Sequence, residues 1–256
     1  MIDSLPTTPS FRLDGRRALV VGASSGIGLG AAVALAEAGA SVVCAGRREK
    51  ELLVLMEALT ARGLSAETLV LDAADVRSTR DAIGRVGPFD VLVNSAGLAR
   101  HAPVLETEEA DFDAVAAINF RGAYFLAQAV ARGMVDAGIR GSIVTISSQM
   151  GHVGGLDRAV YAATKHAVEG FTKSMAIELG PHGIRVNTIG PTFVRTPLTA
   201  STFADPERVA WIEQKIKLGR IGTVEDVMGA VVFLASDASA LVTGTSLLVD
   251  GGWTAG

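Results

Sequence analysis

Short apolar segments alternate with helical segments along almost the whole chain, and this alternation restricts the possible folds more than any other feature of the sequence. The apolar segments are short and continuous, which is typical of strands covered on both faces. Alternation of strands and helices at this spacing predicts βαβ units with right-handed crossovers and a parallel sheet. We expect strands at residues 17–22, 41–46, 68–72, 89–94, 142–147, 184–189 and 246–249, and helices at 28–38, 49–61, 76–85, 109–137, 158–179, 206–216 and 224–234.

No linker, low-complexity stretch or shift in composition divides the 256 residues. The predicted fold class is therefore α/β, a single doubly wound domain of Rossmann type. We expect a seven-stranded parallel sheet with helices on both faces. Residues 1–12 are polar and contain proline, so we interpret them as an N-terminal tail that precedes a folded domain at 13–256.

Composition excludes several classes of function. A net charge of −4 lacks the basic footprint of a nucleic-acid-binding protein. No apolar run approaches the roughly 20 residues that span a bilayer, and the first residues lack a signal-peptide pattern. The single cysteine, Cys44, excludes an internal disulfide, and the four histidines have no metal-ligand spacing. We expect a cytoplasmic protein with no metal site and no nucleic-acid or membrane partner.

A glycine-rich segment joins the first strand to the first helix, with Gly22, Gly26 and Gly28 in the spacing G-x-x-x-G-x-G. Glycine allows a sharp turn and a close approach to a pyrophosphate, while the N-terminus of the following helix attracts negative charge. The alternative is a turn without a ligand, because the spacing is not the commonest dinucleotide fingerprint, G-x-G-x-x-G. The candidate phosphate contacts are Gly22, Ser24, Ser25, Gly26, Ile27 and Gly28.

The second strand ends at Gly46-Arg47-Arg48, without the acidic residue that selects NAD in dinucleotide folds. A guanidinium suits a 2′-phosphate, so Arg47 and Arg48 favour NADP(H) over NAD(H). The alternative is a solvated pair of arginines at the start of a surface helix. Asp72 ends the third strand and is either an adenine contact or a helix cap.

Tyr161 and Lys165 are four positions apart on a predicted helix, so they share one face. A neighbouring ammonium lowers the pKa of a phenol, which improves it as a general acid or base. Ser148 follows the fifth strand, where the carboxyl ends of the strands line the ligand crevice. Together these residues predict proton transfer to or from a substrate oxygen.

These motifs resemble the short-chain dehydrogenase/reductase family over Leu13–Trp253. The Thr-Gly-x-x-x-Gly-Ile-Gly loop of the family matches at its glycines, with Val21 in place of the threonine. The resemblance implies that the catalytic residues are Asn119, Ser148, Tyr161 and Lys165. It also implies further cofactor contacts at Asn94, Ala96, Gly97, Tyr161, Lys165, Pro191, Val194 and Thr196, with Ser95 and Thr192 departing from the family pattern.

The resemblance implies a dinucleotide-binding catalytic domain that transfers a hydride between a nicotinamide cofactor and a carbonyl/alcohol pair. It further implies that Lys165 binds the nicotinamide ribose and that Asn119 supports a water relay to Lys165. Members of this family form tetramers through their two long helices, so the apolar faces at 109–137 and 158–180 predict a homotetramer.

The motifs around Ser148 and Ser95 also resemble dicarbonyl/L-xylulose reductases and bacterial polyol dehydrogenases. We therefore expect a small ketose, polyol or dicarbonyl substrate, held by loops at about 149–158 and 191–218. The alternatives are a 3-oxoacyl-carrier-protein or steroid-type reductase, and a non-catalytic NADP-binding sensor. The candidate substrate contacts are Ser148, Gln149, His152, Thr192, Phe193 and Trp211.

Overall fold

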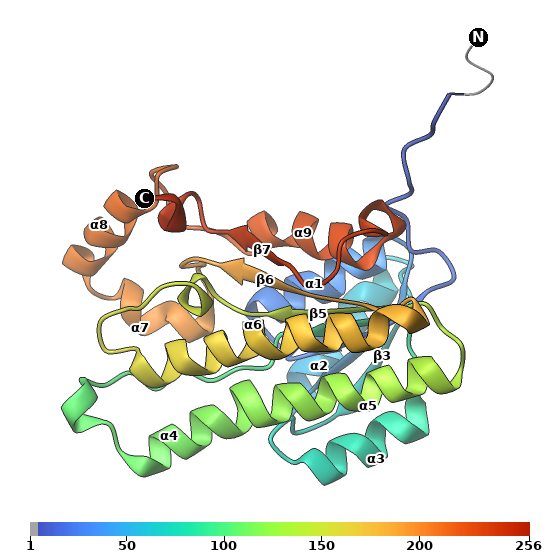
Figure 1. Ribbon diagram of the computed structural model, residues 1–256, viewed down its shortest axis with the longest axis horizontal. Coiled ribbons are helices and arrows are strands. Elements are labelled where there is room, and N and C mark those ends of the chain that lie inside the picture. Colours follow the sequence, from blue (N-terminus) through green and yellow to red (C-terminus); the bar gives the residue numbers. More distant parts are fainter. Residues whose placement is uncertain (1–4) are drawn as a thin grey trace.

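Seven parallel strands form the centre of the protein in a computed structural model that describes residues 5–256 (Figure 1). Their order is β3-β2-β1-β4-β5-β6-β7, so the direction of winding reverses between β1 and β4. This confirms the predicted doubly wound, seven-stranded parallel sheet in a single domain. The strands are β1 (Arg17–Val21), β2 (Ser41–Gly46), β3 (Ala66–Val70), β4 (Val91–Asn94), β5 (Ser142–Ile146), β6 (Arg185–Pro191) and β7 (Ser246–Val249).

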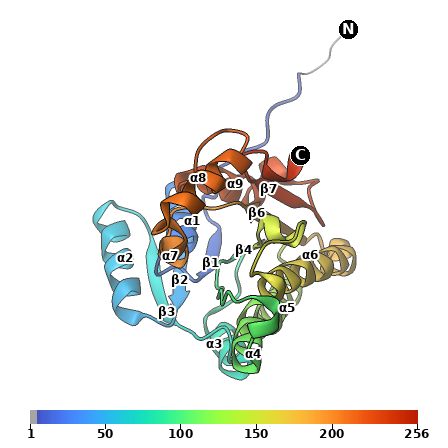
Figure 2. The ribbon, with the colours of Figure 1, turned by 90° about the vertical axis from the view of Figure 1, so that its left-hand side faces the viewer.

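Helices cover both faces of the sheet, as Figure 2 shows from the side. On one face lie α1 (Gly26–Glu37), α2 (Glu49–Ala61) and α9 (Glu225–Ala235), and on the other lie α3 (Val76–Val86), α4 (Glu109–Ala116), α5 (Ala123–Asp136) and α6 (Ala159–Leu179). Two further helices, α7 (Ala200–Phe203) and α8 (Pro206–Lys215), follow β6.

Successive residues of each buried strand pack into two different cores. In β1, Ala18 and Val20 face the core under α1, α2 and α9, whereas Leu19 and Val21 face the core under α3, α5 and α6. The alternation follows from the two-residue repeat of a strand. Because both faces are buried, the strand segments are apolar throughout, which is why they could be found in the sequence.

The predicted helix at 109–137 is divided by a π-helical segment, Ala117–Gly122. Tertiary contacts explain this segment. Asn119 bonds the backbone of the neighbouring loop, and Gly122 packs so closely that a Cβ would collide with the carbonyl oxygen of Ala73. The extra residue in the helical turn lets both contacts form.

Two other expectations about the elements were wrong in detail. β3 lies at Ala66–Val70 instead of 68–72, because it is an edge strand with partly exposed residues and its start carries no apolar signal. α7 was not expected, and it falls inside the loop predicted at 191–218.

The helical run Glu109–Asp136 is, among residues 5–256, the one segment long and apolar enough to span a membrane by length and composition. No such segment was expected from the sequence. Nearly half of the most apolar part of this run is buried. Because the run packs against α3 and α6, the core helix of a globular fold accounts for its apolar character.

The described residues before the folded domain are exposed, and the cysteine is buried. Residues 5–12 are exposed and have no regular secondary structure, while the first four residues of the predicted tail lie outside the described part. Cys44 is fully buried, and burial raises the pKa of its thiol to about 11.

Candidate active site

A cleft of about 460 Å³ lies at the carboxyl ends of the strands, where the winding of the sheet reverses. This is the ligand crevice expected of a doubly wound sheet. Its lining comes from the loop after β1, the ends of β2 and β3, the loops after β4, β5 and β6, and α6. The predicted cofactor residues in this lining are Gly22, Ser24, Ser25, Gly26, Ile27, Arg47, Arg48, Asp72, Ala96, Gly97, Tyr161, Lys165, Pro191, Val194 and Thr196.

The glycines of the first loop are required by close packing. Gly22 has a φ of +87°, and a Cβ there would lie 2.8 Å from the backbone nitrogen of Ala96. Gly28 lies in the first turn of α1, outside the lining, and a Cβ there would collide with the carbonyl oxygen of Gly22. Ser25 is the N-cap residue of α1, but its side chain makes no capping hydrogen bond. The N–H groups of the first turn thus remain available, and the loop fits a pyrophosphate.

The two arginines after β2 lie beside this loop. Arg48 donates hydrogen bonds of 2.8 and 2.7 Å to the hydroxyls of Ser24 and Ser25. Arg47 is exposed and lines the same end of the cleft. Asp72 also lines the cleft, and its carboxylate accepts a 3.0 Å bond from the N–H of Ala74, so it caps its own turn.

Two asparagines position the opposite wall without lining the cleft. Asn94 is buried and accepts a 3.1 Å bond from the N–H of Ala96. Asn119 bonds both the N–H and the carbonyl oxygen of Leu98 at 2.8 Å, and also contacts Thr164 at 3.3 Å. Its amide therefore holds the loop after β4. The water relay to Lys165 stays a prediction.

Ser148, Tyr161 and Lys165 meet at the other end of the cleft. Ser148 forms a side-chain hydrogen bond with Tyr161, and its hydroxyl accepts a 3.1 Å bond from the N–H of Met150. Lys165 is buried, donates a 2.9 Å bond to the carbonyl oxygen of Ile146, and lies 5.5 Å from the centre of the Tyr161 ring. The structure thus brings the three predicted residues together.

The electrostatics of this group differ from the expectation. Burial raises the pKa of Tyr161, outweighing the lowering by its hydrogen bond to Ser148 and by the charge of Arg158. Arg158 is therefore a cation that favours the phenolate, and it was not expected from the sequence. Burial also lowers the pKa of Lys165 to about 8, although Glu169 opposes the shift.

The six predicted substrate residues separate into three groups. Ser148 and Thr192 line the cleft. Gln149 follows Ser148 in the chain, Phe193 follows Thr192, and both are buried. The two polar atoms of the Gln149 amide and the hydroxyl of Thr192 have no hydrogen-bond partner among the described residues.

His152 and Trp211 do not reach the cleft lining. His152 lies 3.0 Å from the hydroxyl of Ser246, because its loop turns toward β7. Trp211 is exposed and packs edge-on at 5.4 Å against Trp253, which borders a separate small core. Their positions do not support direct substrate contact.

Sequence reasoning missed two residues beside Tyr161. Arg158 precedes α6, is buried, and donates a hydrogen bond to His101, whose ring packs edge-on against Tyr161 at 5.9 Å. The position of Arg158 three residues before Tyr161 was a usable signal, since residues at that spacing share a helix face. The distant His101 gave no such signal.

Comparison with known proteins agrees with this geometry. Residues 22–254 match the protein family described as Enoyl-(Acyl carrier protein) reductase. A D-erythrulose reductase from Gallus gallus is 44% identical over 96% of this chain and 98% of that protein. An L-xylulose reductase from Bos taurus is 42% identical over 96% of this chain and 99% of that protein.

Among solved structures, a gluconate 5-dehydrogenase from Burkholderia cenocepacia J2315 in complex with NADP and tartrate is similar, with a TM-score of 0.93. It is 40% identical, covering 96% of this chain and 98% of its own. Fold, motifs and relatives agree over nearly the full length. The chain is an oxidoreductase that belongs to the short-chain dehydrogenase/reductase family.

Proposed function

We propose that this protein interconverts a carbonyl and a secondary alcohol on a small polyhydroxylated substrate, with NADP(H) preferred over NAD(H). The observation that carries the proposal is the position of Ser148, Tyr161 and Lys165 at one end of a cleft whose other end is a phosphate loop flanked by arginines. A dinucleotide placed along the cleft would extend from the loop to the tyrosine.

The catalytic roles follow from hydrogen-bonding capacity. When bound, the reduced cofactor supplies a hydride to the carbonyl carbon. Tyr161 then donates its proton to the carbonyl oxygen, so that one hydride and one proton give the alcohol. Ser148 donates a hydrogen bond to the same oxygen, and Lys165 binds the cofactor ribose and favours the tyrosinate. In the reverse direction the tyrosinate removes the hydroxyl proton.

Arg47 and Arg48 support the preference for NADP(H). Arg48 is already held over Ser24 and Ser25, so its guanidinium is positioned for a 2′-phosphate, and Gly46 offers no carboxylate to repel one. The solved gluconate 5-dehydrogenase, which contains NADP, has the same fold. The remaining cofactor contacts, at Pro191, Val194 and Thr196, belong to this proposal as well.

Unpaired polar atoms support a hydroxylated substrate. The amide of Gln149 and the hydroxyl of Thr192 are buried without hydrogen-bond partners among residues 5–256. Thr192 lines the cleft, and Gln149 follows the lining residue Ser148 in the chain. A site with such groups discriminates strongly in favour of substrates that bond them. The names of the relatives, D-erythrulose and L-xylulose reductase, point to the same class.

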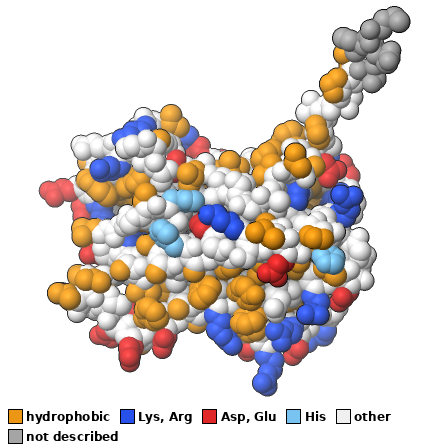
Figure 3. All heavy atoms as spheres, in the orientation of Figure 1, with side chains coloured by type: hydrophobic (Ala, Val, Ile, Leu, Met, Phe, Trp, Pro, Cys, Tyr) orange, Lys and Arg blue, Asp and Glu red, His pale blue; other side chains and the backbone are white. Residues whose placement is uncertain are grey.

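We also propose a homotetramer in the cytoplasm. Aromatic side chains form a cluster on the outer side of α5 and α6, where Phe120 stacks on Phe171 at 6.5 Å. Phe120 and Ile177 remain 44% and 77% exposed, and Figure 3 shows hydrophobic side chains over these helices. A second copy would bury them. Light scattering that gives a monomer mass at micromolar concentration would refute the assembly.

A substrate panel tests the activity. Reduction of ketoses and small dicarbonyls should exceed reduction of steroid ketones, 3-oxoacyl thioesters and enoyl thioesters, and NADPH should be used more efficiently than NADH. The enoyl substrate is included because the matched family is described as an enoyl reductase. An acyl thioester turned over about a hundred times more efficiently than any sugar would reject the proposed substrate class.

A further inference from the structure

A buried cation adjoins the substrate end of the cleft and has no anionic partner. Arg158 is 8% exposed, and no carboxylate of residues 5–256 lies within ion-pair distance of its guanidinium. The groups whose negative charge favours the charged form of Arg158 are the phenol of Tyr161 and then Asp157. Burying an unpaired charge is unfavourable, so the position calls for a functional explanation.

The neighbours of Arg158 leave most of its donors unused. An arginine has five N–H donors and no acceptor, so the bond to His101 must end on the lone pair of the imidazole Nε2. Burial, and then the charges of Arg158 and Arg208, lower the pKa of His101 to about 4, which keeps the ring neutral at physiological pH. The ring of Phe193, 5.2 Å from the guanidinium carbon, offers a cation–π contact but no acceptor.

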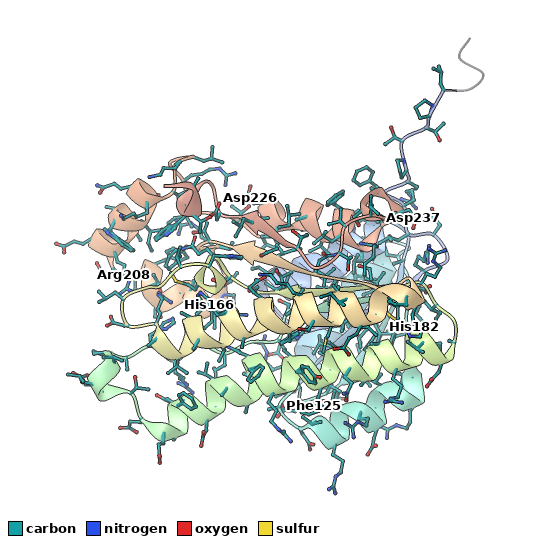
Figure 4. The ribbon with its side chains drawn as sticks, in the orientation of Figure 1. Phe125, His166, His182, Arg208, Asp226 and Asp237 are labelled. Atoms are coloured by element: carbon teal, nitrogen blue, oxygen red, sulfur yellow. The ribbon has the colours of Figure 1, made fainter. Side chains whose placement is uncertain are left out.

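A second cation, Arg208, lies near Arg158 and His101. Arg208 on α8 is half-buried, has no ion pair within the described chain, and its positive charge acts on both His101 and Arg158. Figure 4 shows it on the side of the molecule where α6 begins. Two positive charges and a neutral histidine thus lie near Tyr161, which lines the cleft.

We propose that Arg158, assisted by Arg208, binds the carboxylate of the substrate, so that the substrate is a sugar acid such as an aldonate or a keto-aldonate. The planar fork of an arginine matches a carboxylate with two parallel hydrogen bonds. Arg158 lies one helical turn before Tyr161, and its neighbours His101 and Phe193 adjoin the lining residues Tyr161 and Thr192. A carboxylate there would be held beside the reacting carbon. The inference rests on the proposed function for the existence of a carbonyl/alcohol site.

Binding without turnover provides the test. D-gluconate and sorbitol differ by a carboxylate in place of a hydroxymethyl group, and neither can transfer a hydride to a cofactor that is already reduced. Dissociation constants for both are measured by calorimetry on the NADPH-loaded protein. Wild type should bind gluconate more tightly, and Arg158→Gln should lower the gluconate-to-sorbitol preference about 10- to 150-fold, as expected for losing charge-assisted hydrogen bonds.

Matched variants show whether the two arginines cause the preference for gluconate over sorbitol. Arg158→Lys and Arg208→Gln should each lower the preference several-fold, which covers the case in which Arg158→Gln does not fold. Arg132→Gln, at an exposed position of α5 outside the cleft, should retain it. No preference in wild type, or a preference unchanged in the Arg158 and Arg208 variants, would overturn the proposal. Tighter binding of phosphorylated sorbitol than of gluconate would assign the position to a phosphate and overturn the carboxylate.

The outcome is separable from that of the proposed function. If gluconate binds through Arg158 while no polyol, ketose or sugar acid is turned over, the carboxylate position stands and the proposed function fails. If neutral ketoses are reduced efficiently and the Arg158 variants bind gluconate as wild type does, the proposed function stands and the carboxylate position fails.

Discussion

The two ends of the cleft are built in different ways. The end at the phosphate loop consists of backbone turns that tolerate only glycine and of two exposed arginines, of which Arg48 is held by serine hydroxyls. The end at Tyr161 consists of buried polar side chains from segments far apart in the sequence, several of which have no hydrogen-bond partner in the described part of the chain. The first end is suited to a ligand that is always the same, and the second can change its specificity through a few side chains.

The largest expected effect is that of replacing Tyr161, which should impair catalysis at one end of the cleft and leave cofactor binding at the other end nearly unchanged. Tyr161→Phe removes the proton that the reaction requires, so kcat should fall by about 10²- to 10⁴-fold. The dissociation constant of NADPH should change little, because the hydroxyl is at the opposite end of the cleft from the phosphate loop. Steady-state kinetics and a fluorescence titration measure both. Retention of more than about a tenth of wild-type kcat would reject Tyr161 as the proton donor.

Replacing an arginine at the other end should have the complementary effect. Arg48→Ala removes charge-assisted hydrogen bonds to a 2′-phosphate, which are worth about 10- to 150-fold in affinity. The preference for NADPH over NADH should fall by this factor, while kcat at saturating NADPH is retained. Arg47→Ala is the companion variant. Equal affinities for the two cofactors in wild type would contradict the assignment.

The backbone basis of the phosphate loop can be tested with two glycines. A Cβ at Gly28 would collide with the carbonyl oxygen of Gly22, whereas a Cβ at Gly229 in α9 would meet open space. Gly28→Ala should lower the free energy of unfolding by about 1–3 kcal/mol and weaken NADPH binding. Gly229→Ala should raise the free energy by about 0.5–1 kcal/mol. Similar urea midpoints for the two variants would show that the loop is not tightly packed.

Lys165 lies at the Tyr161 end of the cleft, and its titration should make the stability of the protein depend on pH. Its pKa is about 8 in the folded protein, below the ordinary 10.5, so the unfolded chain binds more protons between these pH values. The free energy of unfolding should therefore rise with pH from about 8 to 10.5, by at most about 3 kcal/mol from this group. The raised pKa of Tyr161 acts in the opposite direction above about pH 10.

Comparison with Lys165→Met isolates this contribution. The variant cannot titrate at this position, so the difference between its unfolding curve and that of wild type should change across the same pH range. Parallel pH profiles from urea unfolding would mean that Lys165 does not titrate there.

Each end of the cleft could be predicted from the sequence only where its interactions join residues that are close together in the chain. The sheet and the phosphate loop were predicted because their signals are local, in continuous apolar runs and closely spaced glycines. The π-helical segment around Asn119 was not, since it depends on a contact with Leu98 in another loop. The pairing of Arg158 with His101 joins residues 57 apart, and the turn of His152 toward Ser246 joins residues 94 apart. Neither has a periodic or motif signal.

Transfer of a labelled hydride tests the central claim most directly. The protein is supplied with NADPH that carries deuterium at its hydride-donating carbon, together with a keto sugar and an enoyl thioester in the same reaction. We predict that mass spectrometry finds deuterium on the carbinol carbon of the sugar product, and that Tyr161→Phe nearly abolishes this incorporation. Deuterium only on the reduced carbon–carbon bond of the acyl chain, or in neither product, would contradict the proposed reduction of a carbonyl.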